Sequence, residues 1–332
     1  MAKRVVGVDF GHRAIRAVEV DNPVGTSGRV VRSAEVTVPD TAIVDGEVRE
    51  VHTVASALKR LWSTGGFKTK RVVLGMGNSR VLARDLTVPS MPLDQIRETL
   101  PFQAQDLLPV PSAGAILDFY PISHGMGENG AVVNGLLIAA LKDVVLANVS
   151  AVRTAGLETV GVDLIPFSLT RLLADSGGRE TVGYIDVGAT TTSVTIATGG
   201  VPQFVRIIPA GGEDVTRALV ERAEFTHEQA ERAKVVLGIP LGPVEADQRA
   251  VADIIVTEAG QLLTGLRNTL NYFVSSRGTA ISRVVVTGGG AQLRGFVNAL
   301  SEMTQLPAQV ADPASDTRMT VALSLAKGST AA

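Results

Sequence analysis

One short motif occurs twice in this chain, each time after a run of β-branched and other apolar residues. The first copy contains Asp9 and Gly11, and the second contains Asp186 and Gly188. An alternating apolar stretch follows each copy, so each is expected to form a strand, a tight turn and a returning strand. Two such hairpins, each with one Asp ahead of its turn, predict two related α/β halves with a nucleotide held between them.

The composition limits which kinds of protein the chain can be. With 332 residues, 45% hydrophobic and 19% charged, it is expected to be globular and to contain more than one domain. A formal net charge of −2 indicates no nucleic-acid partner, and the absence of cysteine excludes disulfides and Cys-ligated zinc. No stretch approaches the roughly 18 apolar residues of a membrane-spanning helix. We expect a cytoplasmic protein with no direct membrane insertion, which reaches a membrane only through a partner.

The two hairpins divide the chain into two expected domains. The first covers residues 1–180 together with 315–332, and the second covers residues 181–314. Residues 78–155, which lie between the hairpins, are interpreted as a small α/β subdomain inserted into the first domain. In the second domain, apolar residues recur every three or four positions over residues 247–276 and predict one long helix. The expected fold class is therefore α/β.

The two tight turns are candidates for binding phosphate. Glycine lets the backbone turn sharply, so that successive amides point inward and surround an anion. Asp9 and Asp186 could hold Mg²⁺, usually through water. The candidate phosphate-binding residues are Gly11, His12, Arg13, Gly188, Ala189, Thr190 and Thr191. An ordinary β-turn would explain either motif alone, whereas the matched pair favours the nucleotide.

Two further stretches could bind the rest of a nucleotide. An apolar strand runs into three consecutive glycines and then a helix, which would let a purine or ribose approach the main chain and would point a helix N-terminus at phosphate. On another predicted helix, Glu231 and Lys234 share a face and could bind ribose hydroxyls, although a solvated ion pair is the more common explanation. The candidates from these stretches and from one glycine pair that opens a helix are Gly211, Gly212, Glu231, Lys234, Gly288, Gly289, Gly290 and Leu293.

These stretches resemble the phosphate-one, phosphate-two, connecting and adenosine motifs of the actin-like ATPase superfamily, which includes actin, DnaK-type chaperones and FtsA. The region between the hairpins narrows the resemblance. It runs from the segment 88–92 (Val-Pro-Ser-Met-Pro) to the segment 117–120 (Leu-Asp-Phe-Tyr). This run is similar to subdomain 1C of the PilM family of type IV pilus assembly. The resemblance covers residues 3–327.

The resemblance implies a fold, cofactors and partners. The fold would be actin-like, with subdomains 1A, 1C, 2A and 2B around a nucleotide cleft, and the cofactors would be ATP and Mg²⁺. The protein would be a scaffold, peripheral at the inner face of the inner membrane through its partners. It would bind the cytoplasmic N-terminal peptide of a PilN-like membrane protein in a groove between subdomains 1A and 1C. Indirect partners would be PilO and the pilus assembly ATPases.

One position departs from the superfamily pattern. DnaK-type relatives carry an acidic residue immediately before a helix-starting proline, where it orients the attacking water, but Ile165 precedes Pro166 here. Asp163 lies two residues earlier, on the same face of the expected strand, and is the candidate catalytic residue. Loss of a positioned base costs on the order of 10²–10⁴-fold in rate. We therefore expect ATP binding with slow or negligible hydrolysis.

The sequence leaves two alternatives open. An FtsA-like cell-division filament protein would carry a basic amphipathic C-terminal helix. The segment 319–326 instead suggests a helix that closes the first domain. A sugar- or acetate-kinase-like phosphotransferase would need a further catalytic Asp, and no additional acidic motif stands out near the hairpins. Head-to-tail filaments are not excluded by the sequence.

Overall fold

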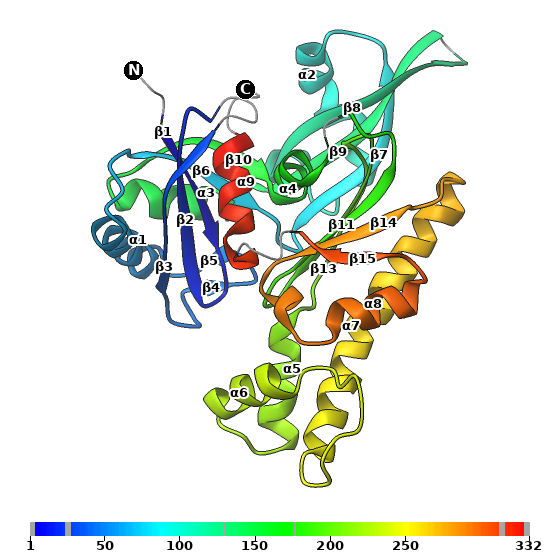
Figure 1. Cartoon of the computed structure of the whole chain (residues 1–332). Coiled ribbons are helices and arrows are strands. Elements are labelled where there is room, and N and C mark those ends of the chain that lie inside the picture. Colours follow the sequence, from blue (N-terminus) through cyan, green and yellow to red (C-terminus); the bar gives the residue numbers. More distant parts are fainter. Residues whose placement is uncertain (1–3, 24–27, 129, 176, 312–315, 329–332) are drawn as a thin grey trace.

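The computed structural model describes residues 4–23, 28–128, 130–175, 177–311 and 316–328. Two five-stranded sheets form its framework (Figure 1). In spatial order, the first sheet consists of β10 (Glu158–Leu164), β6 (Arg71–Met76), β1 (Arg4–Phe10), β2 (Ala14–Asp21) and β3 (Arg29–Thr37). The second consists of β15 (Ala308–Val310), β14 (Arg283–Thr287), β11 (Thr181–Val187), β12 (Thr192–Thr198) and β13 (Val201–Ile208).

The two sheets have the same topology. In each, the first three strands in sequence form an antiparallel meander, and two parallel strands extend the sheet beyond the first strand. The doubled Asp-x-Gly motif occupies the first meander turn in both sheets. This repeat confirms the predicted fold class of two related α/β halves. The expected boundary at residues 314 and 315 lies outside the described residues.

The first sheet is covered by helices on both faces. Helices α1 (Val51–Gly65) and α3 (Lys142–Thr154) pack on one face, and a short hairpin of β4 (Ile43–Val44) and β5 (Glu47–Val48) lies beside them. Helix α1 buries Val54, Leu58 and Leu61 at helical spacing. Full burial of each such aliphatic side chain contributes about 1.5–3 kcal/mol, so this stripe fixes the orientation of the helix.

The second sheet is covered mainly by one long helix. Helix α7 (Arg249–Arg277) confirms the helix predicted over residues 247–276, and with α8 (Phe296–Thr304) it covers one face of the sheet. The far part of α7 extends beyond the sheet, where α5 (Gly212–Arg222) and α6 (His227–Leu237) pack against it (Figure 1). The second half therefore consists of a sheet-based part and a helical part.

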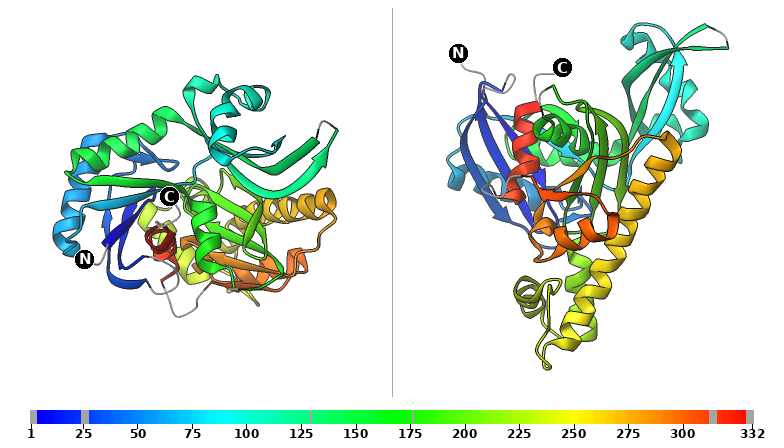
Figure 2. Two further views of the ribbon diagram at one scale, coloured as in Figure 1. Left: turned by 90° about the horizontal axis from the view of Figure 1, so that it is seen from above. Right: turned by 45° about the vertical axis from the view of Figure 1, so that its right-hand side comes forward.

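Helices α4 (Ile165–Leu173) and α9 (Thr320–Gly328) join the two halves. Both pack on the other face of the first sheet, and α4 also contacts the second sheet. Buried Ser168 and Ser324 hydrogen-bond to each other at 2.8 Å across the helix pair. Figure 2 shows α9, in red, between the two sheets. This junction is a largely apolar contact between the halves.

The inserted region forms a three-stranded antiparallel sheet with the order β7 (Val81–Pro89), β9 (Gly130–Leu141) and β8 (Ala115–Gly127). Helix α2 (Leu93–Gln103) covers it through Ile96 and Leu100, and two 3-10 turns (Gln105–Leu107 and Ser112–Gly114) follow. The predicted insertion ends with α3, which packs its apolar side chains both in the core of the first sheet and against the inserted sheet.

The inserted sheet also contacts the second half. Val205 of β13 is buried with Val81 and Leu136 of the insertion, and Arg277 at the end of α7 pairs with Asp85. Figure 2 shows the insertion beside the upper end of α7. Among the residues described, no helix is both long and apolar enough to cross a membrane.

Candidate functional site

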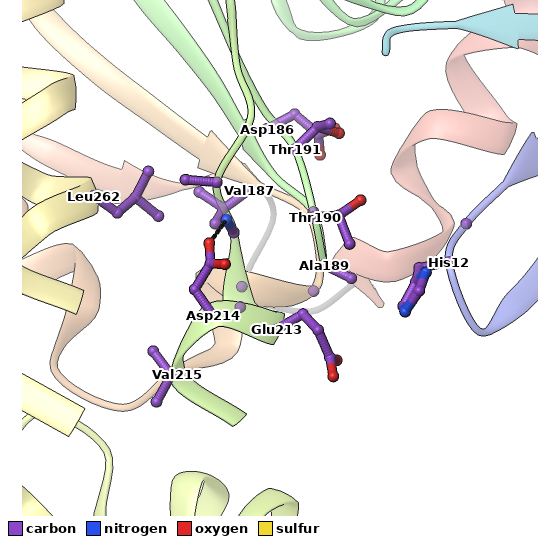
Figure 3. A pocket seen from close by; sticks show the side chains of 18 of the residues that line it. His12, Asp186, Val187, Ala189, Thr190, Thr191, Glu213, Asp214, Val215 and Leu262 are labelled. Carbon is purple, nitrogen blue, oxygen red and sulfur yellow. Dashed lines mark hydrogen bonds between the residues drawn. The ribbon is translucent and has the colours of Figure 1, made fainter. Parts of the chain in front are cut away.

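A cavity of about 1030 Å³ lies between the two halves, and residues of both halves line it. It brings together every predicted metal-binding and nucleotide-binding residue. These are Asp9, Gly11, His12, Arg13, Asp186, Gly188, Ala189, Thr190, Thr191, Gly211, Gly212, Glu231, Lys234, Gly288, Gly289, Gly290 and Leu293. Figure 3 shows Ala189 and Thr190 on the side of the cavity that faces His12. Stretches distant in sequence therefore converge on one cavity.

The two predicted phosphate turns have the same hydrogen-bond pattern. The N–H of Gly11 donates to the carbonyl of Ala14 at 3.1 Å, and the N–H of Gly188 donates to the carbonyl of Thr191 at 2.9 Å. A Cβ atom at either glycine would lie under 3.0 Å from that same carbonyl oxygen. Glycine is therefore required here by a close backbone approach, and only amides beyond these two glycines remain candidates for binding an anion.

The two aspartates fit a divalent cation. Asp9 and Asp186 are the second-to-last residues of β1 and β11, so both line the cavity from the end of a strand. Among the described residues, the buried Oδ1 atom of Asp186 has no hydrogen-bond partner. Leaving a buried carboxylate oxygen unpaired is costly unless a cation neutralises it. Carboxylate oxygen is also the ligand that Mg²⁺ prefers, so the residues present fit the predicted metal.

Burial in the cavity raises the proton affinity of both carboxylates. Burial raises the pKa of Asp9, and Arg16, whose Nη1 lies 3.9 Å from Asp9 Oδ2, opposes that rise. Burial and the nearby charge of Asp9 raise the pKa of Asp186 to about 7, against the same opposing effect of Arg16. Near neutral pH, Asp186 therefore exchanges a proton readily, and a bound cation would displace that proton.

The predicted ribose pair is not a solvated surface pair. The Nζ atom of Lys234 donates to Glu231 Oε1 at 2.6 Å, to Thr216 Oγ1 at 2.7 Å and to the carbonyl of Gly212 at 3.1 Å. Partial burial raises the pKa of Glu231, but hydrogen bonds from Lys234 and Thr216 outweigh it, so the pKa lies below its ordinary value. The pair ties α6 to the start of α5 and presents an ionised carboxylate to the cavity.

The predicted glycine pair before α5 has a packing role. The N–H of Gly212 donates to the carbonyl of Gly188 at 3.0 Å, and the N–H of Glu213 donates to the carbonyl of Ala189 at 2.8 Å. A Cβ atom at Gly211 would lie 2.5 Å from both carbonyl oxygens. Figure 3 shows Asp214 capping this helix start through the Gly211 N–H, at 2.9 Å. The first α5 amides therefore hold the second turn in place.

The three consecutive glycines pack against the second hairpin. Gly288 has φ +88°, in the left-handed region, and a Cβ there would lie 2.6 Å from Asp186 Oδ1. A Cβ at Gly290 would lie 2.3 Å from a methyl carbon of Val187. A 3-10 helix, Gly289–Gln292, includes two of these glycines, and α8 begins at Phe296, three residues after the predicted helix start at Leu293. The chain therefore makes a tighter turn between the glycines and that helix.

The structure does not bring Asp163 into the cavity. Its carboxylate pairs with Arg171 of α4, and burial raises the pKa of Asp163 against the opposing charge of Arg171. The expected alternation fails because α4 already begins at Ile165. Ile165 does line the cavity and packs against Gly75 and Gly77. An apolar side chain thus occupies this place in the cavity.

Several titratable residues of the cavity were not among the predicted ligands, and three of them contact side chains that were. Arg16 lies directly opposite Asp9 in the β1–β2 register, so strand alternation could have identified it. Glu213 and His227 open α5 and α6 and contact Arg13 from the other half of the molecule. No local sequence pattern indicates that long-range contact.

Comparisons with known proteins agree with this geometry. A family model described as type IV pilus assembly protein PilM matches residues 7–327. The solved PilM-PilN type IV pilus biogenesis complex contains a chain with 26% identity and a TM-score of 0.84, covering 99% of each chain. Cell division protein FtsA of Bacillus subtilis (strain 168) is 22% identical over 87% of this chain and 77% of its own length. MreB5 of Spiroplasma citri bound to AMPPNP has the same fold, with 14% identity and a TM-score of 0.56 over 98% of this chain and 96% of that chain.

Proposed function

This chain belongs to the PilM family of type IV pilus assembly proteins, and from this premise we propose that it is a scaffold that binds ATP with Mg²⁺ and hydrolyses it slowly or not at all. The observation that carries the proposal is the cavity between the halves. It collects every predicted nucleotide-binding residue around two partly buried aspartates, one of which has a buried oxygen without a hydrogen-bond partner among the described residues.

Each part of the cavity has a place in this proposal. Asp9 and Asp186 would hold Mg²⁺, which neutralises phosphate charge when it is bound. The amides of the two turns would surround the phosphates, and the ionised Glu231 carboxylate would accept hydrogen bonds from ribose hydroxyls. The glycines at 288–290 would let the base lie against the main chain.

Slow hydrolysis is supported by what lines the phosphate end of the cavity. Ile165 has no group that accepts a proton, and Asp163 is turned away towards Arg171. Without a positioned base or water-orienting group, the rate falls by on the order of 10²–10⁴-fold. The nucleotide would then be a bound component of the scaffold, and the two halves would stay closed around it.

We propose the cytoplasmic N-terminal peptide of a PilN-like membrane protein as the direct partner, in a groove between the first sheet and the inserted sheet. The support is the similarity to a chain of the PilM-PilN complex over nearly the whole length of both chains. This partner would place the scaffold at the inner face of the inner membrane. Links to PilO and to the pilus assembly ATPases would be indirect.

One set of binding measurements tests the proposal. The protein is purified, any retained nucleotide is identified by mass spectrometry, and Mg²⁺-ATP and ADP binding are measured by calorimetry. Affinity for a synthetic PilN-type N-terminal peptide is then compared with ATP, with ADP and without nucleotide. We expect micromolar or tighter ATP binding and phosphate release slower than about one turnover per minute, well below typical enzyme rates.

The matched control is Asp94→Asn, which removes a carboxylate exposed on α2 and should change none of these values. Absence of ATP binding in the wild-type protein would refute the nucleotide part. Equal peptide affinity in all three nucleotide states would remove any switch. Phosphoryl transfer to sugars or acetate would favour the phosphotransferase alternative, and ATP-dependent sedimentation would favour a filament former.

A further inference from the structure

A small group of polar side chains that includes cavity-lining residues connects the first turn to α5 and α6. Arg13 extends from the first turn to the helical part of the second half. Its Nη1 lies 3.0 Å from His227 Nδ1, and its Nη2 donates to Glu213 Oε1 at 3.3 Å. Asp40 of the first half lies 3.1 Å from the same Nη2 and holds the guanidinium from its own side. The contact therefore bridges the two halves directly.

The hydrogen-bond pattern of this group is consistent with a single protonation state. A guanidinium can only donate, so the Nδ1 of His227 must accept from Arg13. The ring proton then lies on Nε2, which faces Glu213 Oε1 at 3.3 Å. Arg13, His227 and Glu213 thus satisfy one another when the imidazole is neutral.

We propose that Arg13 is a latch residue: its side chain holds the α5–α6 part of the second half against the first half, and cavity occupancy acts on this contact. This differs from the phosphate-binding role predicted from the sequence, because the guanidinium is already engaged across the cavity. The link to occupancy rests on the proposed nucleotide site, whereas the latch itself does not.

The Arg13 contact should open more easily than the α4–α9 junction. The side chains of Arg13, Glu213 and His227 keep 36%, 15% and 35% of their surface exposed. Ion pairs at such exposure are weak and exchange readily with water. The α4–α9 junction, in contrast, buries apolar side chains, and exposing them to water would be unfavourable. The junction can act as the hinge and the Arg13 contact as the closing element.

The latch lies next to the proposed ribose site, which gives a physical route for coupling. Ligand atoms of Glu213, His227 and Glu231 all lie within 4.8 Å of one another. Two positive charges contact these three residues: Arg13 contacts Glu213, and Lys234 donates a hydrogen bond to Glu231. A ribose hydroxyl bound by Glu231 would directly change the electrostatic surroundings of His227 and Glu213.

The latch is tested by measuring the separation of the halves without nucleotide. Because the chain has no cysteine, Ser56→Cys on α1 and Val236→Cys on α6 allow two spin labels and a pulsed-EPR distance distribution. We expect Arg13→Ala and Glu213→Gln to shift the distribution to longer distances and to broaden it. The charge-swapped pair Arg13→Glu with Glu213→Arg should restore it in part. Arg232→Ala is the matched control, since Arg232 pairs only along α6, with Glu228.

The second arm measures nucleotide release. With Mg²⁺-ATP bound, Arg13→Ala should release nucleotide about three- to tenfold faster than the control, the range expected for a weak surface contact. Unchanged distance distributions in both Arg13→Ala and Glu213→Gln, with wild-type circular dichroism, would overturn the latch. Failure of the wild-type protein to bind nucleotide would instead refute the proposed function and leave the nucleotide-free distances as the test of the latch.

Discussion

The two hairpins share a backbone but differ in the residue that faces each aspartate. In the register of the first hairpin, Asp9 lies opposite Arg16. In the second, Asp186 lies opposite Ser193. Arg16 therefore lies beside Asp9, while burial and the charge of Asp9 raise the pKa of Asp186 to about 7 against the opposing effect of Arg16. The two turns share their backbone geometry and differ in the charge carried by the position across the strand pair.

The same contrast appears one strand further along each sheet. After β14, Gly288 approaches the Asp186 carboxylate closely and leaves no room for a side chain. After β6, the corresponding approach is filled by Ile165, which packs over Gly75 and Gly77. The second half is therefore arranged around a charge, and the first half offers an apolar surface at this place. That division supports binding of a metal–nucleotide complex without a general base that would promote its hydrolysis.

The largest expected effect follows from the unpaired oxygen of Asp186. Asp186→Asn should weaken Mg²⁺-ATP binding by about 10²-fold or more, roughly 2.7 kcal/mol, because it removes a metal ligand that has no local substitute. Asp9→Asn should weaken Mg²⁺-ATP binding less, since Arg16 remains to attract phosphate. Calorimetric titration of both variants checks the order. A greater loss for Asp9→Asn would reverse the comparison between the hairpins.

Gly288→Ala should give the next largest effect, on stability. The new Cβ would lie 2.5 Å from the Val187 carbonyl and 2.6 Å from Asp186 Oδ1, at a φ of +88°. Strain of this kind costs about 1–3 kcal/mol. The control is Gly260→Ala inside α7, where a Cβ meets open space. This substitution should raise the free energy of unfolding by roughly 0.5–1 kcal/mol. Denaturant unfolding of both variants measures the difference, and equal stabilities would show that the loop is not held against the carboxylate.

The hairpins and the cavity could be predicted from sequence because their signals are local. An Asp and a Gly after β-branched runs specify a strand and a tight turn. The shared motif then specifies that the two turns are related, and all residues predicted to bind nucleotide or metal do line one cavity. The register opposite each Asp also follows from alternation, so Arg16 was accessible to the same reasoning.

Other features could not be predicted because they depend on where elements stop or on distant contacts. Asp163 was assigned to the cavity by extending strand alternation through residue 165, but α4 begins there and the carboxylate turns to Arg171. The Arg13 contact with α5 and α6 joins residues about 200 positions apart in sequence. No periodic pattern encodes such a pairing, since it arises only when the halves are packed around α4 and α9.

The raised pKa of Asp186 predicts a pH dependence of stability in the absence of nucleotide and metal. A carboxyl group whose pKa is raised on folding stabilises the protein below its unfolded pKa of about 4, and this contribution is lost as pH rises through about 7. Asp186→Asn should therefore be more stable than wild type at pH 8, by on the order of 1–3 kcal/mol, and similar to it at pH 4. Thermal unfolding between these pH values measures the gap, which adding Mg²⁺-ATP should close. A gap that grows towards pH 4 would contradict the direction of the shift.

The smallest expected effect isolates the difference at the position facing each Asp. Arg16→Gln removes the cation 3.9 Å from Asp9, so the pKa of Asp9 should rise further. Stability at pH 8 should then fall by about 0.5–1 kcal/mol, and the loss should shrink as pH falls and Asp9 takes up a proton in both proteins. Arg217→Gln is the control, because Arg217 also lines the cavity but pairs with Asp214. If Arg16→Gln leaves the pH profile unchanged, the first hairpin does not neutralise its own carboxylate, and the two halves need an external cation equally.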